Sequence, residues 1–145
     1  MSVGDWEVSS ALIVAQLLGA LVRADAGTQP SRLALYTTSR PASILEGHAD
    51  TPQAVIVLAK PCGAIVEDQL VLYVADNSGA MVAASGVPRW AEWIAGDGTV
   101  LTRCDVTDLE NGGGIRVLGS ATPPGDISPM LYAGGKVQLG LIALT

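Results

Sequence analysis

The segment WAEWIAGDGTVLTRCDV, residues 90–106, contains two apolar runs separated by Gly96-Asp97-Gly98. Glycine and aspartate tolerate the positive φ angles that a tight turn between antiparallel strands requires. The apolar and β-branched residues on either side of the turn are typical of strands. The segment therefore predicts a β-hairpin with strands over residues 91–95 and 99–106.

Side-chain alternation along this hairpin divides its residues between two faces of a sheet. Trp90 and Trp93 are three residues apart, so a strand sends them to opposite faces. We expect one tryptophan to lie in the core and the other at an exterior or interface position, and we take both as interface candidates. On the second strand we expect an inward face formed by Val100, Thr102, Cys104 and Val106.

The chain after Gly27 consists of short β-branched segments separated by glycines and prolines every 8 to 12 residues or so. This spacing is typical of a sandwich or a small barrel. We predict a mainly β fold, an antiparallel β-sandwich of jelly-roll-like form, over residues 28–145 as one compact unit. Asp76-Asn77-Ser78-Gly79 predicts a second hairpin. The further strands are expected over residues 32–37, 54–59, 69–75, 81–85, 115–118 and 136–144.

Residues 1–27 are predicted to form an N-terminal helical segment. Ser9 and Ser10 offer an N-cap before the good helix formers of residues 11–23, and Gly27 is placed like a C-terminal cap. Apolar residues recur at helical spacing in a broad stripe, which favours packing on a sheet or on a neighbouring subunit. The interface candidates on this one N-terminal α-helix are Leu12, Leu17, Leu18 and Leu21.

The composition indicates that part of the protein's surface is buried against partner molecules. Apolar residues make up 49% of the 145 residues and charged residues only 15%, which is too little charge to cover the surface of a free monomer. We therefore expect a homo-oligomer, a dimer or a trimer. The net charge of −6 disfavours nucleic acid and anionic membranes as partners. The apolar run over residues 11–22 is shorter than the ~20 residues that cross a bilayer, so we expect no membrane partner.

The C-terminal run from Lys136 to Thr145 is apolar and almost without charge. An exposed apolar strand edge invites aggregation, so this run is expected to be paired, either inside its own sheet or with a neighbouring molecule. Leu141 and Leu144 are the interface candidates of this run.

Catalytic chemistry has few candidate residues in this sequence. His48, between Glu46 and Asp50, is the single histidine and so the single candidate base of a serine hydrolase, and no Gly-x-Ser-x-Gly segment presents a nucleophile. A metal site at His48 lacks paired thiols nearby. We predict a polar, solvent-facing loop around His48, no enzyme activity, no metal and no cofactor. A small hydrolase centred on His48 stays open as an alternative.

A binding function is a second alternative. Trp90 and Trp93, with Arg89 beside them, could form an aromatic platform for a carbohydrate or a receptor in a chain that has few aromatic residues.

The order of several segments resembles a known group of proteins. After a short N-terminal helix come LALYTTSRPA (residues 33–42), ASGVPRW (84–90), the turn GDGTV (96–100) and YAGGKVQL (132–139). In this order they resemble the small structural proteins encoded among the virion genes of tailed bacteriophages and prophages.

The resemblance implies a virion subunit that is present in many copies, is made in the cytoplasm of the bacterial host, and holds its place by surface burial and strand pairing. A capsid decoration or cement protein, a minor capsid protein seated on the major capsid protein, is the first expectation. A tail or head-to-tail component is the alternative within the virion.

Overall fold

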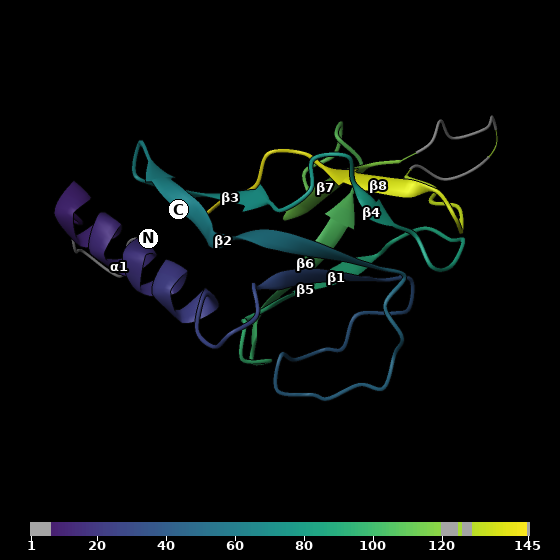
Figure 1. The fold of residues 1–145 in the computed structure, drawn as a ribbon, viewed down its shortest axis with the longest axis horizontal. Helices are drawn as coiled ribbons and strands as arrows, with labels where there is room; N and C mark the ends of the chain where they lie inside the picture. The colour runs from purple at the N-terminus through teal and green to yellow at the C-terminus, as the bar shows by residue number, and fades with distance from the viewer. Residues whose placement is uncertain (1–6, 120–124, 126–128, 145) are drawn as a thin grey trace.

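The computed structural model describes residues 7–119, 125 and 129–144, which form one helix and nine strands (Figure 1). The prediction of a mainly β fold with one N-terminal helix is confirmed for this part of the chain. The elements are α1 (Ser10–Ala24), β1 (Arg32–Tyr36), β2 (Ala54–Val66), β3 (Gln69–Val74), β4 (Ala80–Met81), β5 (Trp90–Ile94), β6 (Val100–Thr107), β7 (Ile115–Leu118), β8 (Lys136–Leu139) and β9 (Ala143–Leu144).

The described strands are hydrogen-bonded in one curled sheet with the order β4-β8-β7-β6-β5-β1-β2-β3-β9. The curl gives a half-barrel, and Ala54 of β2 forms an isolated bridge with Val82, which follows β4 at the other end of the sheet. Separate facing layers, as in a sandwich or a jelly-roll, are not confirmed.

The expectation of a wholly antiparallel sheet is wrong at β6 and β7, which pair in parallel through Val106 and Thr107. The connection of residues 108–114 doubles back along β6 before β7 begins. Gly114 permits this return, because a Cβ at Gly114 would lie 2.8 Å from the Cβ of Cys104. Gly113 N–H donates to the Thr107 hydroxyl at 3.0 Å and holds the turn against the strand.

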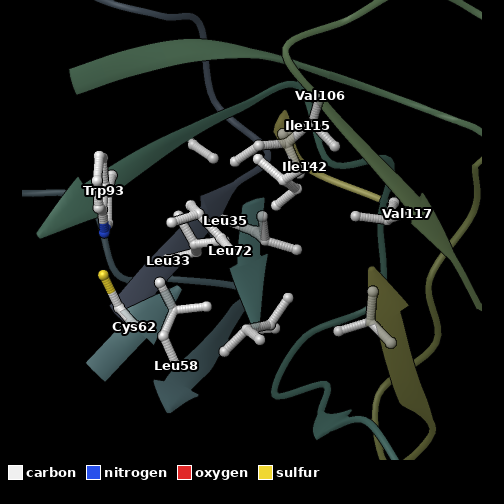
Figure 2. Packing of buried hydrophobic residues seen from close by; sticks show 14 of the residues in the cluster. Leu33, Leu35, Leu58, Cys62, Leu72, Trp93, Val106, Ile115, Val117 and Ile142 are labelled. Atoms are coloured by element: carbon white, nitrogen blue, oxygen red, sulfur yellow. The ribbon is translucent and has the colours of Figure 1, made fainter. Parts of the chain in front are cut away.

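The core fills the concave face of the sheet (Figure 2). Leu33 and Leu35 of β1, Leu72 of β3, and Val117 of β7 point into one cluster, as alternation along strands requires. The cluster also contains Ile56, Leu58, Cys62, Leu70, Trp93, Val106, Ile115, Val137 and Ile142.

The β5–β6 hairpin across Gly96-Asp97-Gly98 is confirmed, and Trp90 and Trp93 lie on opposite faces as predicted. Cys104 and Val106 face the inner core as expected. Val100 packs instead against a separate cluster on the convex side, formed by Ala34, Tyr36, Trp90 and Ile94. The β5–β6 pairing shifts its register between Trp93 and Ile94 and places Val100 opposite Ile94, so the side chain of Val100 points to the convex face.

The second predicted hairpin is wrong. Residues 76–79 form a turn, but β4 pairs with β8, because both edges of β3 are already taken by β2 and β9. The predicted strand over residues 81–85 is reduced to Ala80–Met81. The C-terminal run is divided between β8 and β9, and β9 is paired with β3 at one edge of the sheet. Residues 120–129, which are rich in proline and lack a periodic pattern, are expected from the sequence to form a surface loop, and most of them lie outside the described residues.

Helix α1 begins at the predicted cap, where the Ser9 side chain accepts from Leu12 N–H at 3.3 Å. It packs on β2 and β3, with Leu17 and Ala24 buried. The Ser10 hydroxyl donates to the Asp68 carboxylate near the first turn, and Arg23 donates to Asp97 at 2.9 Å near the last. The helix is therefore fixed to the sheet at both ends.

Candidate interaction surface

The outward face of α1 is apolar and is not covered by the other residues that the structure describes. Leu12, Leu18 and Val22 are exposed, Val22 to 70% of its surface. The other exposed residues between Leu12 and Val22 are Ala15 and Gly19, with Gln16 as the polar exception. An amphipathic surface helix presents charged and polar residues on this side. α1 instead offers apolar surface on the side that faces away from its own sheet.

The predicted helix candidates divide into two groups. Leu12 and Leu18 lie on the uncovered face, whereas Leu17 is 8% exposed and belongs to the core of this chain. Leu17 is therefore corrected from an interface residue to a core residue, because it lies on the side of α1 that packs on the sheet. Leu21 is half-buried and packs against the same core.

A second apolar surface lies on the convex side of the sheet, where none of the interface candidates predicted from the sequence lies. Val55 and Val57 of β2, Tyr73 of β3 and Met81 of β4 are exposed. A shallow hollow of about 220 Å³ is lined by both valines, Ala75 and Met81. The signal was present in β2: residues 54–59 are apolar throughout, so the outward positions of the strand carry no polar side chains.

The C-terminal candidates also separate. Leu141 is 69% exposed, between β8 and β9. Leu144 is half-buried, packs against the inner core, and lines a cavity on the concave face of the sheet.

Trp90 and Trp93 are both buried, so the expectation that one of them lies at the surface is wrong. Trp93 belongs to the inner core. Trp90 is covered on the convex side by the loop of residues 40–52, whose His48 ring lies 5.0 Å from it, and it stacks on Tyr36 with centroids 4.4 Å apart. With both indoles inside, Trp90 and Trp93 do not form with Arg89 the exposed aromatic platform that the alternative of a carbohydrate or receptor site requires.

A buried polar centre lies on the same convex side, around Glu92 of β5. The Glu92 carboxylate is held by three groups: Tyr36 Oη and His48 Nε2 each lie 2.9 Å from Oε1, and Arg103 Nε donates to Oε2 at 2.9 Å. Glu92 is 2% exposed. Arg103 also donates to the Ser43 carbonyl, and Asp50 N–H donates to His48 Nδ1 at 3.2 Å. The loop of residues 40–52 is thereby fixed to the sheet.

The electrostatics of this centre favour an ionised Glu92. Burial by itself raises the pKa of Glu92, but the hydrogen bonds from His48, Tyr36 and Arg103 outweigh burial and hold that pKa below its usual range. Burial raises the pKa of the Tyr36 hydroxyl well above its usual range, and the neighbouring Glu92 carboxylate adds to the effect. Tyr36 therefore remains a hydrogen-bond donor. The Arg103 guanidinium balances the charge of the Glu92 carboxylate, and both carboxylate oxygens have hydrogen-bond partners.

This geometry corrects the prediction of a solvent-facing loop at His48, whose side chain is only 15% exposed. Both ring nitrogens are engaged, one with Glu92 and one with Asp50, while Glu46 stays at the surface. Among the described residues, no three histidine, cysteine, aspartate or glutamate side chains gather in a way that could hold a metal ion. This geometry indicates a structural role for His48, whose hydrogen bonds hold the loop of residues 40–52 over Trp90.

A cavity of about 220 Å³ opens on the concave face. Leu33, Leu72, Trp93, Cys104, Ile115 and Ile142 are among the residues that line it. Trp93 Nε1 is buried and has no hydrogen-bond partner in the described part of the chain. Cys62 and Cys104 are free thiols. The concave side therefore differs from the Glu92 centre in having unfilled space and an unpaired donor.

No helix within the described ranges is long and apolar enough to span a membrane. Comparison with family models, with curated proteins and with solved structures gives no match to this chain. Its function is therefore inferred from its own residues.

Proposed function

We propose that this chain is a non-enzymatic structural protein of a tailed-bacteriophage virion, a decoration or cement protein that binds the major capsid protein and stabilises the head. The observation that carries the proposal is the uncovered apolar face of α1. The resemblance of the ordered segments to virion structural proteins gives the biological setting. The subunit is made in the host cytoplasm and resides in the virion.

The apolar face of α1 needs a partner because exposure of Leu12, Leu18 and Val22 to water is unfavourable. Burial of one such side chain contributes about 1.5–3 kcal/mol. The face is also free of unmatched charge, since Arg23 beside it is paired with Asp97 at 2.9 Å. A surface of this kind loses little polar hydration when a partner covers it.

The convex surface at Val55, Val57 and Met81 gives the subunit a second contact. A cement protein needs one surface for its own copies and one for the shell. We assign the face of α1 to the first and the convex surface to the second, so that separating the copies also removes the avidity of the oligomer for the head. We infer a homo-oligomer, a dimer or a trimer, that is seated on the shell.

We also propose that the strands are arranged as a jelly-roll-like sandwich. Leu58 and Leu70 from β2 and β3 share one core with Val117 and Val137 from β7 and β8, as the two layers of a sandwich do. The hydrogen-bonded order nevertheless connects these strands through a single curled sheet.

Co-sedimentation with purified heads of the encoding phage tests the proposal. The wild-type chain should pellet with heads at a constant ratio to the major capsid protein. The double variant Leu18→Glu, Val22→Glu should lose affinity by roughly a hundredfold or more, because two buried side chains are removed and two charges are placed in the contact. Thr28→Glu, an exposed polar position outside α1, is the matched control for the added charge and should retain binding.

Two outcomes would decide against a head protein. A wild-type chain that fails to pellet with heads and stays monomeric at high concentration contradicts the proposal. A chain that pellets with tails or with the head-to-tail connector, and not with shells, supports the runner-up, a tail or head-to-tail component.

A further inference from the structure

The exposed residues of α1 include a line with the spacing of a coiled coil. Ala11, Ala15, Leu18 and Val22 are all exposed, and they follow one another at intervals of four, three and four residues. This is the spacing at which one helix contacts another along its length. We call these four residues the α1 seam. The sheet lies on the other side of α1, so the seam is open to a second helix (Figure 1).

Gly19 borders the α1 seam, and the packing of this subunit does not require a glycine there. Glycine weakens the interior of a helix relative to alanine. Beyond the backbone of the helix itself, a Cβ at Gly19 would have no atom of the described chain within 4 Å. The missing side chain therefore makes room for nothing in the same subunit. It makes room for a partner, because the distance between two packed helices depends on the size of the side chains at their contact.

The order of small and large residues along the α1 seam favours an antiparallel copy of α1 as this partner. With a twofold axis between Ala15 and Leu18, Ala11 lies opposite the partner's Val22, and Ala15 lies opposite the partner's Leu18. Each layer of the contact then joins one small and one large side chain. A parallel pair in register would place alanine on alanine and leucine on leucine, which packs the successive layers unevenly.

The start of α1 is acidic, which also favours the antiparallel arrangement. The Ser10 hydroxyl in the first turn donates to Asp68, and Glu67 beside it is exposed. In a parallel pair, these two carboxylates would lie next to the same two carboxylates of the second copy. Like charges brought together across a contact oppose association. An antiparallel pair separates the two acidic turns by the length of the helix.

The end of α1 offers the complementary charge. Lys60 Nζ donates to the carbonyl of Gly27, just after the helix, at 2.7 Å, and Lys60 forms no ion pair with a carboxylate in the described part of the chain. Arg23, in the last turn, is matched within the subunit by Asp97 at 2.9 Å. An antiparallel pair brings the acidic turn of one copy toward Lys60 of the other. Opposite charges and opposed helix dipoles then meet at both ends of the contact.

We propose that α1 pairs with α1 of a second copy in antiparallel orientation, about a twofold axis that passes between Ala15 and Leu18. This inference rests on the function proposed above, which assigns the face of α1 to contacts between copies. It goes further in naming the arrangement. A contact that uses the same surface on both copies closes after two chains, so the α1 seam builds a dimer and not a trimer.

Disulfide cross-linking of the full chain tests the orientation. Ala11→Cys and Val22→Cys are made separately in a Cys104→Ala background, because Cys104 is partly accessible whereas Cys62 is buried. A mixture of the two variants, left to exchange subunits and then mildly oxidised, should form a disulfide-linked dimer. Neither variant alone should form one, because position 11 lies opposite position 22 and far from its own copy.

The single variants are the matched controls for the mixture. A linked dimer from each variant alone would show a parallel pair and overturn the proposed orientation. A mixture that forms no linked dimer would overturn the helix pair itself.

An exchange of side-chain size tests the packing of the α1 seam. Ala15→Leu places two large side chains in one layer and should weaken association by about tenfold or more. The double variant Ala15→Leu, Leu18→Ala again joins one large and one small side chain in that layer, and should recover the wild-type dissociation constant to within about threefold. Sedimentation equilibrium measures the constants. Both positions are exposed in the single chain, so each variant should fold as the wild type does. A stronger association of Ala15→Leu would show a contact that follows apolar area alone, and would overturn close packing at the seam.

Co-sedimentation with heads separates this inference from the function on which it rests. Chains that pellet with heads but link in the parallel orientation overturn the antiparallel pair and leave the head protein standing. Chains that link as predicted but do not pellet with heads support the pair and contradict the head protein. A wild type that stays monomeric, yet loses head binding in Leu18→Glu, Val22→Glu, would show that the shell covers the seam, and would overturn the pair.

Discussion

Glu92 and Trp93 are neighbours on β5, and their two sides of the sheet are organised differently. On the convex side, the Glu92 carboxylate has three partners and is covered by a loop. On the concave side, Trp93 lines a cavity of about 220 Å³, and its buried Nε1 has no hydrogen-bond partner among the described residues. A buried group of charged residues is often taken as an active site, yet here its partners are complete. The side with fewer polar groups is the one that leaves a cavity.

The largest effect on the free energy of unfolding is expected on the convex side, at the Glu92 centre. Glu92→Ala leaves Arg103, His48 and Tyr36 without their common acceptor, and removal of one partner from a buried ion pair costs about 3–5 kcal/mol. Urea denaturation followed by tryptophan fluorescence should show this loss in the free energy of unfolding. Glu46→Ala, at an exposed position of the covering loop, is the control and should stay within about 0.5 kcal/mol of the wild type. A tolerated Glu92→Ala would contradict the structural role of the centre.

Acid should reduce the stabilisation that the ionised Glu92 carboxylate provides on the convex side. The pKa of Glu92 is lower in the folded chain than in the unfolded chain, so its stabilising contribution is fully present above the unfolded value of about 4.5 and is lost as the pH falls through the folded value. The free energy of unfolding of the wild type should therefore fall more steeply below pH ~4.5 than that of Glu92→Gln, which cannot titrate. Parallel curves for the two proteins would show that Glu92 is not held in its ionised form.

The smallest expected effect compares the two tryptophans. Trp90→Phe removes a paired N–H and the stacking partner of Tyr36, and should destabilise the fold by about 1–3 kcal/mol. Trp93→Phe removes a donor that has no partner in the part of the chain that the structure describes, so its cost should be smaller by about 1 kcal/mol. Thermal and urea unfolding of the two variants measure the difference. A larger loss for Trp93→Phe would mean that its N–H is already paired within the folded chain.

Local patterns predicted much of the fold. The turn Gly96-Asp97-Gly98 between apolar runs placed β5 and β6, and Ser9 placed the start of α1. β2 was predicted too short because its turn to β3, Glu67-Asp68, carries no glycine, although both residues adopt positive φ. Hairpins and helix caps are local events, so neighbouring residues are sufficient to indicate them.

The candidate site was less predictable because it depends on distant contacts. His48 reaches Glu92 across 44 residues, and Arg103 reaches Ser43 across 60. The loop of residues 40–52 has no periodic pattern, so nothing in it indicated that it covers Trp90. Leu17 and Leu18 are adjacent and chemically identical, and only the position of the sheet decides which of them is left uncovered.

The account depends on the apolar face of α1 being covered by another molecule when the protein acts. Light scattering coupled to size-exclusion chromatography measures this most directly, with the wild type and Leu18→Glu, Val22→Glu compared across a wide range of concentrations. We predict a mass of two or three chains for the wild type and of one chain for the variant, which should keep the circular-dichroism spectrum of the folded wild type. A wild type that remains a single chain at every concentration, or a variant of unchanged mass, would contradict it.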